Sequence, residues 1–163
     1  MSTMIVGTSD RLETVMELAQ QQRWDCERLD EEELELFVFI QGEELQVRVT
    51  DLPQYDAMHF AFAAAKLTIP KRRHYQMRKM LGRINERLWA GHFDLYPETK
   101  QVLFRHTLLL AGQEAGKESC EAVMAFGRTS YEVYLTSFVL VAGGICDSEA
   151  ALKSADFGAD GSA

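Results

Sequence analysis

The sequence predicts an α+β fold, in which helices pack on an antiparallel sheet. Apolar and polar residues alternate with a period of two through residues 24–62 and 92–110, as they do in strands. Apolar residues at helical spacing precede, separate and follow these two stretches. Single helices between runs of strands, without a strand–helix–strand repeat, favour an antiparallel sheet. The expected order is therefore α-β-β-β-β-α-β-β-α.

The first helix is expected to begin at Asp10, because an aspartate side chain can accept from the free N–H groups of a first turn. A meander of four strands should follow. In the second of these strands Phe37 and Phe39 alternate with aliphatic residues, which predicts a strand covered on both faces. The four expected strands are residues 24–29, 34–40, 45–50 and 58–62.

Pro70 is expected to open the second helix, in the position where the missing proline N–H costs nothing, and Gly91 is placed to end it. Four apolar residues at spacings of four, three and four predict a helix face turned to the core. They are Met77, Leu81, Ile84 and Leu88. A third helix is expected over Lys117–Val141. All these elements should form one domain, residues 1–153, and the small and polar residues of 154–163 predict a disordered tail.

A hairpin with a four-residue connection is expected after Gly91. In the expected register, the residue numbers of each cross-strand pair add up to 197. In this register Phe93 faces Phe104 on an apolar face. His92 faces Arg105 on the other face, with Asp94 as a diagonal neighbour, which predicts a salt bridge between Asp94 and Arg105.

The same register argues against a metal site. His92 and Asp94 have the spacing of a metal-binding pair on a strand, but His106 falls on the opposite face. A site made of these three residues would need a register that the apolar pattern opposes, so no metal and no other cofactor is expected.

The composition is that of a globular protein without a membrane segment. No apolar run reaches the roughly 18 residues of a membrane span, and the N-terminus lacks the basic and apolar regions of a signal peptide. Cys26, Cys120 and Cys146 show no paired spacing, which disfavours a disulfide framework or a zinc site. A cytoplasmic location is expected.

Charge is unevenly distributed along the chain, whose formal net charge is −8. Residues 1–60 carry −10 and residues 111–163 carry −5, whereas residues 61–110 carry +7. Most cations of this middle segment fall on the second helix. They are Lys71, Arg72, Arg73, Arg78, Lys79, Arg83 and Arg87.

Three interpretations of this basic helix are open. Nucleic-acid binding is disfavoured, because the pI is near 5.0 and the cations do not alternate with aromatic residues. A protein partner is the second interpretation. A solvated or internally paired face is favoured, since the acidic stretch 25–35 can supply an anionic partner within the chain or across a dimer.

No group of residues forms a recognisable catalytic site, so the protein is not expected to be an enzyme. The loop Gly112–Ser119 follows a strand and precedes a helix, as a phosphate-binding loop does. However, three residues rather than four separate its glycines, and Glu118 stands where serine or threonine is needed.

One block, INERLWAGHFDL at Ile84–Leu95, is specific over many consecutive positions. Weaker blocks lie on both sides of it, at 60–62, 69–70, 104–110, 143–144 and 148–152. Together they cover about Asp10 to Leu152 and resemble the YbjN-like family of bacterial proteins, which are labelled sensory transduction regulators.

The resemblance implies a fold like that of type III secretion chaperones, which are commonly dimeric and bind protein segments without hydrolysing them. It supplies no catalytic residues. The chain departs from the family late in the third helix, where Tyr134, Leu135 and Ala142 stand in place of a proline and a tryptophan.

The expected function is that of a non-enzymatic, chaperone-like or regulatory module that binds another polypeptide, with a homodimer as a further possibility. The candidate contact patch is Trp89, His92, Asp94 and Arg105. A structural role for these residues is the favoured alternative: Trp89 would anchor the helix end, and the Asp94–Arg105 pair would staple the hairpin. The alternative function is a ligand-sensing domain with a pocket between the sheet and the third helix.

Overall fold

The computed structural model describes residues 10–160, with side chains through Asp156. In this part of the chain six antiparallel strands form one sheet, accompanied by four α-helices. The helices are α1 (Arg11–Gln22), α2 (His74–Arg87), α3 (Lys117–Ala142) and α4 (Ser148–Asp160). Helices α1, α2 and α3 pack against the sheet, and α4 packs on α2 and α3. The strands are β1 (Asp25–Arg28), β2 (Glu33–Ile40), β3 (Glu43–Leu52), β4 (Ala57–Ala64), β5 (His92–Tyr96) and β6 (Gln101–Leu109). The α+β class and the antiparallel sheet that the sequence predicts are confirmed.

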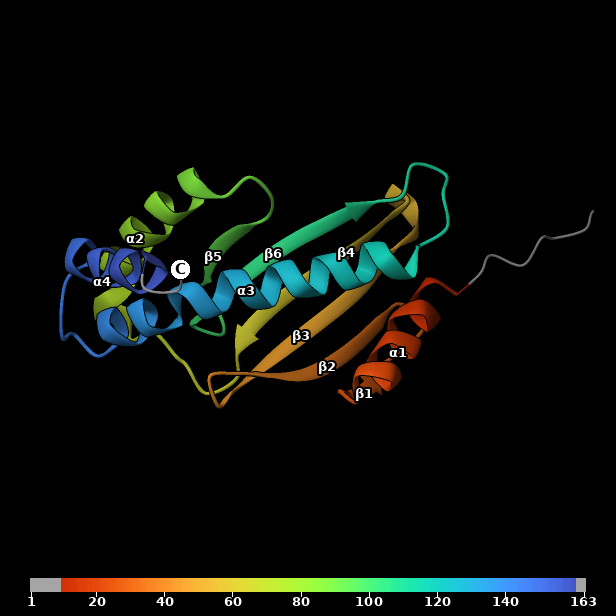
Figure 1. The fold of residues 1–163 in the computed structure, drawn as a ribbon, viewed down its shortest axis with the longest axis horizontal. Helices are drawn as coiled ribbons and strands as arrows, with labels where there is room; N and C mark the ends of the chain where they lie inside the picture. Colours follow the sequence, from red (N-terminus) through yellow and green to blue (C-terminus); the bar gives the residue numbers. More distant parts are fainter. Residues whose placement is uncertain (1–9, 161–163) are drawn as a thin grey trace, which may run out of the picture.

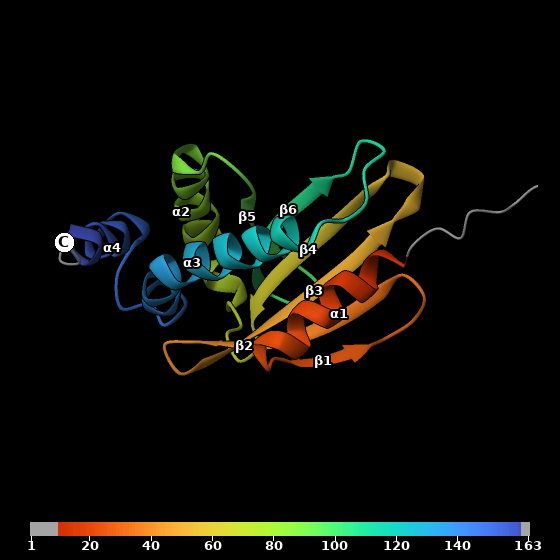
Figure 2. The ribbon, with the colours of Figure 1, turned by 45° about the vertical axis from the view of Figure 1, so that its right-hand side comes forward.

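The sheet has the order β1-β2-β3-β4-β6-β5. The first four strands form the predicted meander, and the β5–β6 hairpin joins it through β6. Helices α1 and α3 lie along one face of the sheet, while α2 and α4 gather at the end near β5 (Figures 1 and 2). The other face of the sheet carries no helix of the described chain.

The core lies between the sheet and the helices, and its six largest fully buried side chains are aromatic. Gly127 lets α3 approach β4 closely, because a Cβ atom there would lie 2.3 Å from the Phe62 ring. The buried Tyr131 hydroxyl donates to the Val102 carbonyl at 2.8 Å and accepts from the Ala64 N–H at 3.1 Å. Burial raises the pKa of Tyr131, so the hydroxyl stays neutral and can serve both bonds.

The prediction that β2 is covered on both faces is wrong. Leu36 and Val38 are buried on the helix side, but Phe39 on the opposite face is 59% exposed. The apolar alternation was correctly identified, yet only one layer of helices exists in the described chain to cover it.

The predicted hairpin register is confirmed. Phe93 pairs with Phe104, and their rings meet edge to face at 5.1 Å between centroids. His92 pairs with Arg105, and Arg105 Nη1 lies 3.2 Å from Asp94 Oδ2, the predicted salt bridge. The pattern of apolar residues therefore fixed which side chains of this hairpin face the core.

The junction between α2 and the hairpin is held by two residues of the specific sequence block. Asn85 accepts from the Phe93 N–H at 2.8 Å and donates to the Phe93 carbonyl at 3.0 Å, as a neighbouring strand would. Gly91 has φ +65°, and a Cβ atom there would lie 2.4 Å from the Phe104 ring. Helix α2 ends at Arg87, before the expected Gly91, because Leu88 is already extended.

A fourth helix corrects the predicted element order and the predicted tail. Helix α4 runs to Asp160, so the expected disorder of 154–163 is not found up to that residue, and 161–163 lie outside the described residues. Asp147 accepts from the Ala150 N–H at 2.9 Å, which caps the helix. Ala151 and Leu152 are buried, and Ser137 of α3 donates to the Ala151 carbonyl at 2.9 Å.

Replacing Asn85 should destabilise the fold, because it leaves the Phe93 N–H and carbonyl without partners in a half-buried site. We expect Asn85→Ala to lower the free energy of unfolding by about 1–3 kcal/mol in urea denaturation. The matched control is Glu86→Ala, an exposed neighbour on the same helix, which should stay within about 0.5 kcal/mol of wild type. Equal effects of the two substitutions would contradict the role assigned to Asn85.

Candidate functional site

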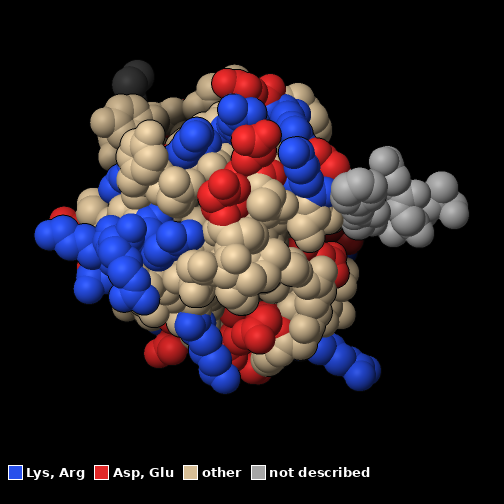
Figure 3. Space-filling view, turned by 90° about the vertical axis from the view of Figure 1, so that its left-hand side faces the viewer, with Lys and Arg blue, Asp and Glu red and all other residues tan. Residues whose placement is uncertain are grey.

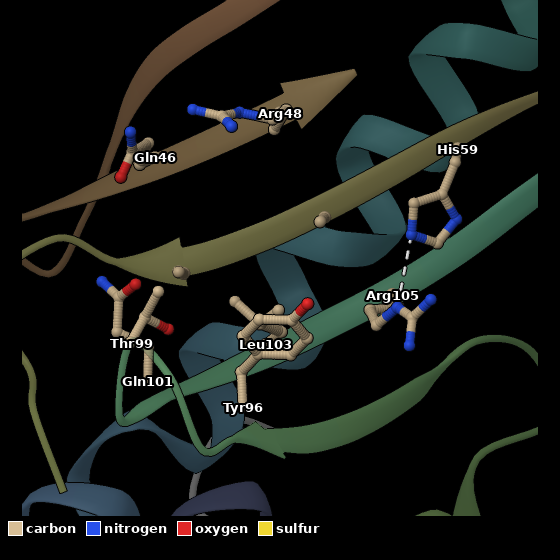
Figure 4. Close-up of a pocket in the computed structure, with 10 residues that line it drawn as sticks. Gln46, Arg48, His59, Tyr96, Thr99, Gln101, Leu103 and Arg105 are labelled. Atoms are coloured by element: carbon tan, nitrogen blue, oxygen red, sulfur yellow. Dashed lines mark hydrogen bonds between the residues drawn. The ribbon is translucent and has the colours of Figure 1, made fainter. Parts of the chain in front are cut away.

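The uncovered face of the sheet contains a groove of about 480 Å³ over β4 (Figure 4). It is lined by polar side chains from β3 and β6, by small residues of β4, and by the β5–β6 turn. The lining residues are Gln46, Arg48, His59, Ala61, Ala63, Tyr96, Thr99, Gln101, Leu103 and Arg105.

The groove exists because the outward positions of β4 carry alanines. In the register of the sheet, Arg48 of β3 pairs with Ala61, and Ala61 pairs with Arg105 of β6. Since neighbouring strands lie about 4.8 Å apart, the two arginines start about 10 Å from each other across an alanine floor. Two guanidinium groups therefore stand on opposite rims of a shallow channel.

The rim formed by β3 is tied to carboxylates of β2. Arg48 Nη2 lies 3.0 Å from Glu35 Oε1, and Gln46 also donates to that oxygen. Glu35 is only 8% exposed, and a buried carboxylate needs partners for its charge. Arg48 and Gln46 are those partners.

The rim formed by β6 belongs to a chain of polar contacts across three strands. Arg105 Nη1 contacts Asp94 at 3.2 Å, and His92 Nε2 lies 3.2 Å from the same carboxylate oxygen. Arg105 Nε donates to His59 Nε2 at 3.3 Å, and His59 Nδ1 lies 2.8 Å from Thr107 Oγ1 (Figure 4 shows the His59–Arg105 bond). Because arginine can only donate, the neutral His59 ring carries its proton on Nδ1.

This arrangement makes His59 a poor base. Burial lowers the pKa of His59, and the positive charge of Arg105 lowers it further. In a serine hydrolase triad a carboxylate holds the far nitrogen of the histidine and stabilises its positive form. Here a guanidinium occupies that position, so the contact of His59 with the Thr107 hydroxyl does not amount to an activated nucleophile.

Three of the four predicted contact residues come together in the structure. His92, Asp94 and Arg105 lie on the open face and form one edge of the polar chain described above. Trp89 lies elsewhere: its ring packs 5.0 Å from that of Phe126 of α3, on the helix side of the sheet, and the side chain is 85% exposed. The four residues therefore do not form a single patch.

The sequence interpretation missed Gln46, Arg48, His59 and Ala61. Each lies on an alternating strand, at a position that the period of two already turned away from the core. The signal that could have found them is the pair of outward alanines in β4. Recognising the groove also required the sheet order, which places β4 between β3 and β6.

Side chains occupy the space between the sheet and α3, the place of the ligand pocket in the alternative function. Phe62, Phe93, Phe104, Tyr131 and Phe138 are each less than 2% exposed there. Within the described residues, no group of three or more His, Cys, Asp or Glu is arranged to hold a metal ion. None of the described helices has the length and apolar character needed to span a membrane.

Fold and groove define this protein as an α+β domain with a one-sided helix layer and an open sheet face. The chain belongs to the YbjN family, since its residues 10–139 match the family model described as "Putative bacterial sensory transduction regulator". No curated protein matches it.

Among solved structures, the chain is similar to a chain of the crystal structure of the ExsC-ExsE complex. The sequences are 15% identical, the TM-score is 0.46, and the match covers 74% of this chain and 89% of that one. A TM-score below 0.5 carries no argument about fold, partner or function, so the type III secretion chaperone-like fold stays a prediction.

The histidines on the sheet should make stability depend on pH. The pKa values of His59 and His106 are lowered in the folded state, chiefly by burial, so the unfolded chain binds protons that the folded chain refuses. Stability is therefore fully present above about pH 6.5 and falls as the pH drops below it, by at most about 1.4 kcal/mol per pH unit for each histidine. Urea midpoints at pH 7.5, 6.0 and 5.0 measure this slope. The double variant His59→Gln/His106→Gln should flatten it, and an unchanged slope would contradict the assignment.

Proposed function

We propose that this protein is a non-catalytic regulatory or chaperone-like module that binds a segment of another polypeptide in the groove over β4. The observation that carries the proposal is the open sheet face, which presents a groove and is covered by no helix of the described chain. Sheet faces of small domains are normally buried or uniformly polar, whereas this one also exposes Phe39, Tyr96 and Leu109.

The chemistry of the groove suits a peptide. Guanidinium and amide donors of Arg48, Arg105 and Gln101 can donate to backbone carbonyls and side-chain carboxylates of an extended chain. Leu103 and Tyr96 supply apolar surface for side chains of that segment. The floor at Ala61 allows a backbone to lie close to the sheet. His92 and Asp94 extend the same polar surface toward β5.

Other parts of the expectation from sequence belong to this proposal. A cytoplasmic location is supported by the three cysteines, all of which are free in the structure. A homodimer is compatible with an open sheet face, which could be covered by a second copy. The unactivated state of His59 supports a protein that binds rather than reacts.

A second candidate function is favoured by one observation. The polar groups of Arg48, His59, Gln101 and Arg105 converge on a groove whose volume falls within the roughly 300–1,000 Å³ of small-molecule sites. A small anionic ligand sensed in this groove, and not between the sheet and α3, is the alternative to a polypeptide.

Filling the groove should remove partner binding without unfolding the protein. Ala61→Phe places a ring over the groove floor at an outward position, where an aromatic residue suits a strand. The control is Leu109→Phe, an outward residue of β6 that is 72% exposed and lies outside the groove. Affinity capture from the native cell, quantified by mass spectrometry, should enrich a protein on wild type and Leu109→Phe, and at least about tenfold less on Ala61→Phe.

Thermal unfolding of both variants checks that each is folded. A partner captured equally by all three baits would place binding outside the groove. If no bait captures any protein, and carboxylate or phosphate compounds raise the melting temperature of wild type but not of Ala61→Phe, the small-ligand alternative is correct.

A further inference from the structure

The basic helix is not neutralised by the acidic stretch of the chain. Strands β1 and β2 lie at one edge of the sheet, and α2 packs beside β5 at the other. Within the acidic stretch, Glu33 and Glu35 pair with Arg48 of β3, and no described ion pair joins the stretch to residues 71–87. The internal pairing that the sequence suggested for the basic helix therefore does not form.

Two cations of residues 71–87 do have internal partners. Arg73 donates to the Val141 carbonyl at 2.7 Å and to the Cys146 carbonyl at 3.1 Å, at the C-terminal end of α3 where a positive charge is favourable. Arg87 lies 2.7 Å from Asp156 of α4. The other five cations make no ion pair with any side chain described between residues 10 and 156. These are Lys71, Arg72, Arg78, Lys79 and Arg83.

Three of the five free cations, Arg78, Lys79 and Arg83, lie on the solvent side of α2, and Lys71 and Arg72 lie in the 3₁₀ turn Lys71–Arg73 that precedes it. Met77, Met80, Leu81 and Ile84 are buried, so the opposite side faces outward. At 3.6 residues per turn, the centre of that side holds Tyr75, Gly82 and Glu86. On α2, Arg78 flanks this centre on one side and Lys79 and Arg83 on the other, and Lys71 and Arg72 are exposed just before the helix begins. We call this surface, from Lys71 to Arg83, the cationic strip.

Figure 3 looks onto the end of the molecule that carries α2 and α4, where Lys and Arg side chains gather and project from the surface. Tyr75 is 74% exposed in the middle of the cationic strip. Tyr75 is the one Phe, Tyr or Trp residue between Lys71 and Arg83. An exposed aromatic ring between cations offers a partner apolar contact as well as charge.

The glycine at position 82 indicates contact with a partner molecule. It lies inside a helix, where glycine is less stable than alanine, and a Cβ atom there would meet nothing within 4 Å. No neighbour in the described chain needs the space, unlike the situation at Gly91 and Gly127. The bare backbone at Gly82 forms a notch between Arg78 and Lys79, where a partner could approach the helix closely.

We propose that the cationic strip binds an acidic, extended segment of a partner polypeptide, with its backbone over Gly82. Outside residues 71–87 the chain carries a net charge of −14, which repels a large polyanion but not a short segment confined to the strip. The 14 residues of α2 span about 21 Å, the length of about six extended residues. This goes beyond the function proposed above, because it concerns a second surface and a partner of stated charge.

The test uses a fluorescein-labelled hexaglutamate peptide and the full chain, followed by fluorescence anisotropy at 50 mM NaCl. Lys79→Glu/Arg83→Glu should weaken binding by at least about tenfold. The matched control, Arg23→Glu/Lys117→Glu, makes the same change in net charge just after α1 and at the start of α3, and should stay within about twofold of wild type. Glu86→Gln, which removes the carboxylate that follows the strip on α2, should tighten binding.

Gly82→Gln separates binding from folding. It fills the notch with a residue that favours helix, so it should raise the melting temperature while weakening peptide binding by at least about threefold. Ala61→Phe separates the two surfaces: a peptide bound to the cationic strip loses affinity in Lys79→Glu/Arg83→Glu and keeps it in Ala61→Phe, whereas a peptide bound in the groove does the reverse and would overturn this proposal.

Several results would overturn the proposal. One is equal loss of binding in the charge-matched control, and another is wild-type affinity in Gly82→Gln or in Lys79→Glu/Arg83→Glu. A single-stranded 12-mer DNA that binds the strip more tightly than the peptide would make nucleic acid the occupant. A dimer seen by sedimentation that Lys79→Glu/Arg83→Glu dissociates, with no binding of the peptide, would make the occupant a second copy of the chain.

Discussion

The rest of the fold depends on how Phe93 is held. Its backbone is clamped by both polar atoms of the Asn85 side chain, and its ring meets those of Phe104, Tyr131 and Phe138 at 5.1 to 5.8 Å. One residue thus joins α2, the hairpin and α3. Because successive strand residues alternate in direction, an inward Phe93 obliges His92 and Asp94 to face outward. The same contact that completes the core therefore positions part of the open surface.

A single layer of helices has consequences for the rest of the sheet. The aliphatic residues of β2 and β3 and the phenylalanines of β4 all turn toward α1 and α3, so the opposite positions are free to carry polar or small residues. Where the outward side chains are long, as at Arg48 and Arg105, neighbouring carboxylates form salt bridges with them. Where the outward side chains are small, as at Ala61, the surface forms a groove. The groove is thus a product of side-chain size on one strand, and needs no special backbone geometry.

Sequence reasoning succeeded where the deciding contacts are local. The hairpin register follows from apolar alternation and one turn, and both are visible within twenty residues of sequence. It failed where distant segments decide. Helix α4 is rich in small residues, and it is held by Ser137 and by the Arg87–Asp156 pair, contacts with distant segments that no local pattern reveals. The sequence also could not show which residues lie near the basic helix. The order of the strands puts this helix and the acidic stretch at opposite edges of the sheet, and strand order is not visible in a local pattern.

The groove and the cationic strip both depend on the packing of α2 against β5. The inner side of α2 holds β5 through Asn85, while its outer side carries the cationic strip, and β5 in turn borders the polar chain that ends at the groove. Loosening Asn85 would therefore disturb both surfaces at once, through loss of the helix–hairpin junction. Substitution of Ala61 changes the groove alone, and substitution of Lys79 and Arg83 changes the cationic strip alone, because all three side chains point away from the core. A partner that requires the groove and the strip together would respond to all three changes, whereas two separate partners would each ignore one of the surface variants.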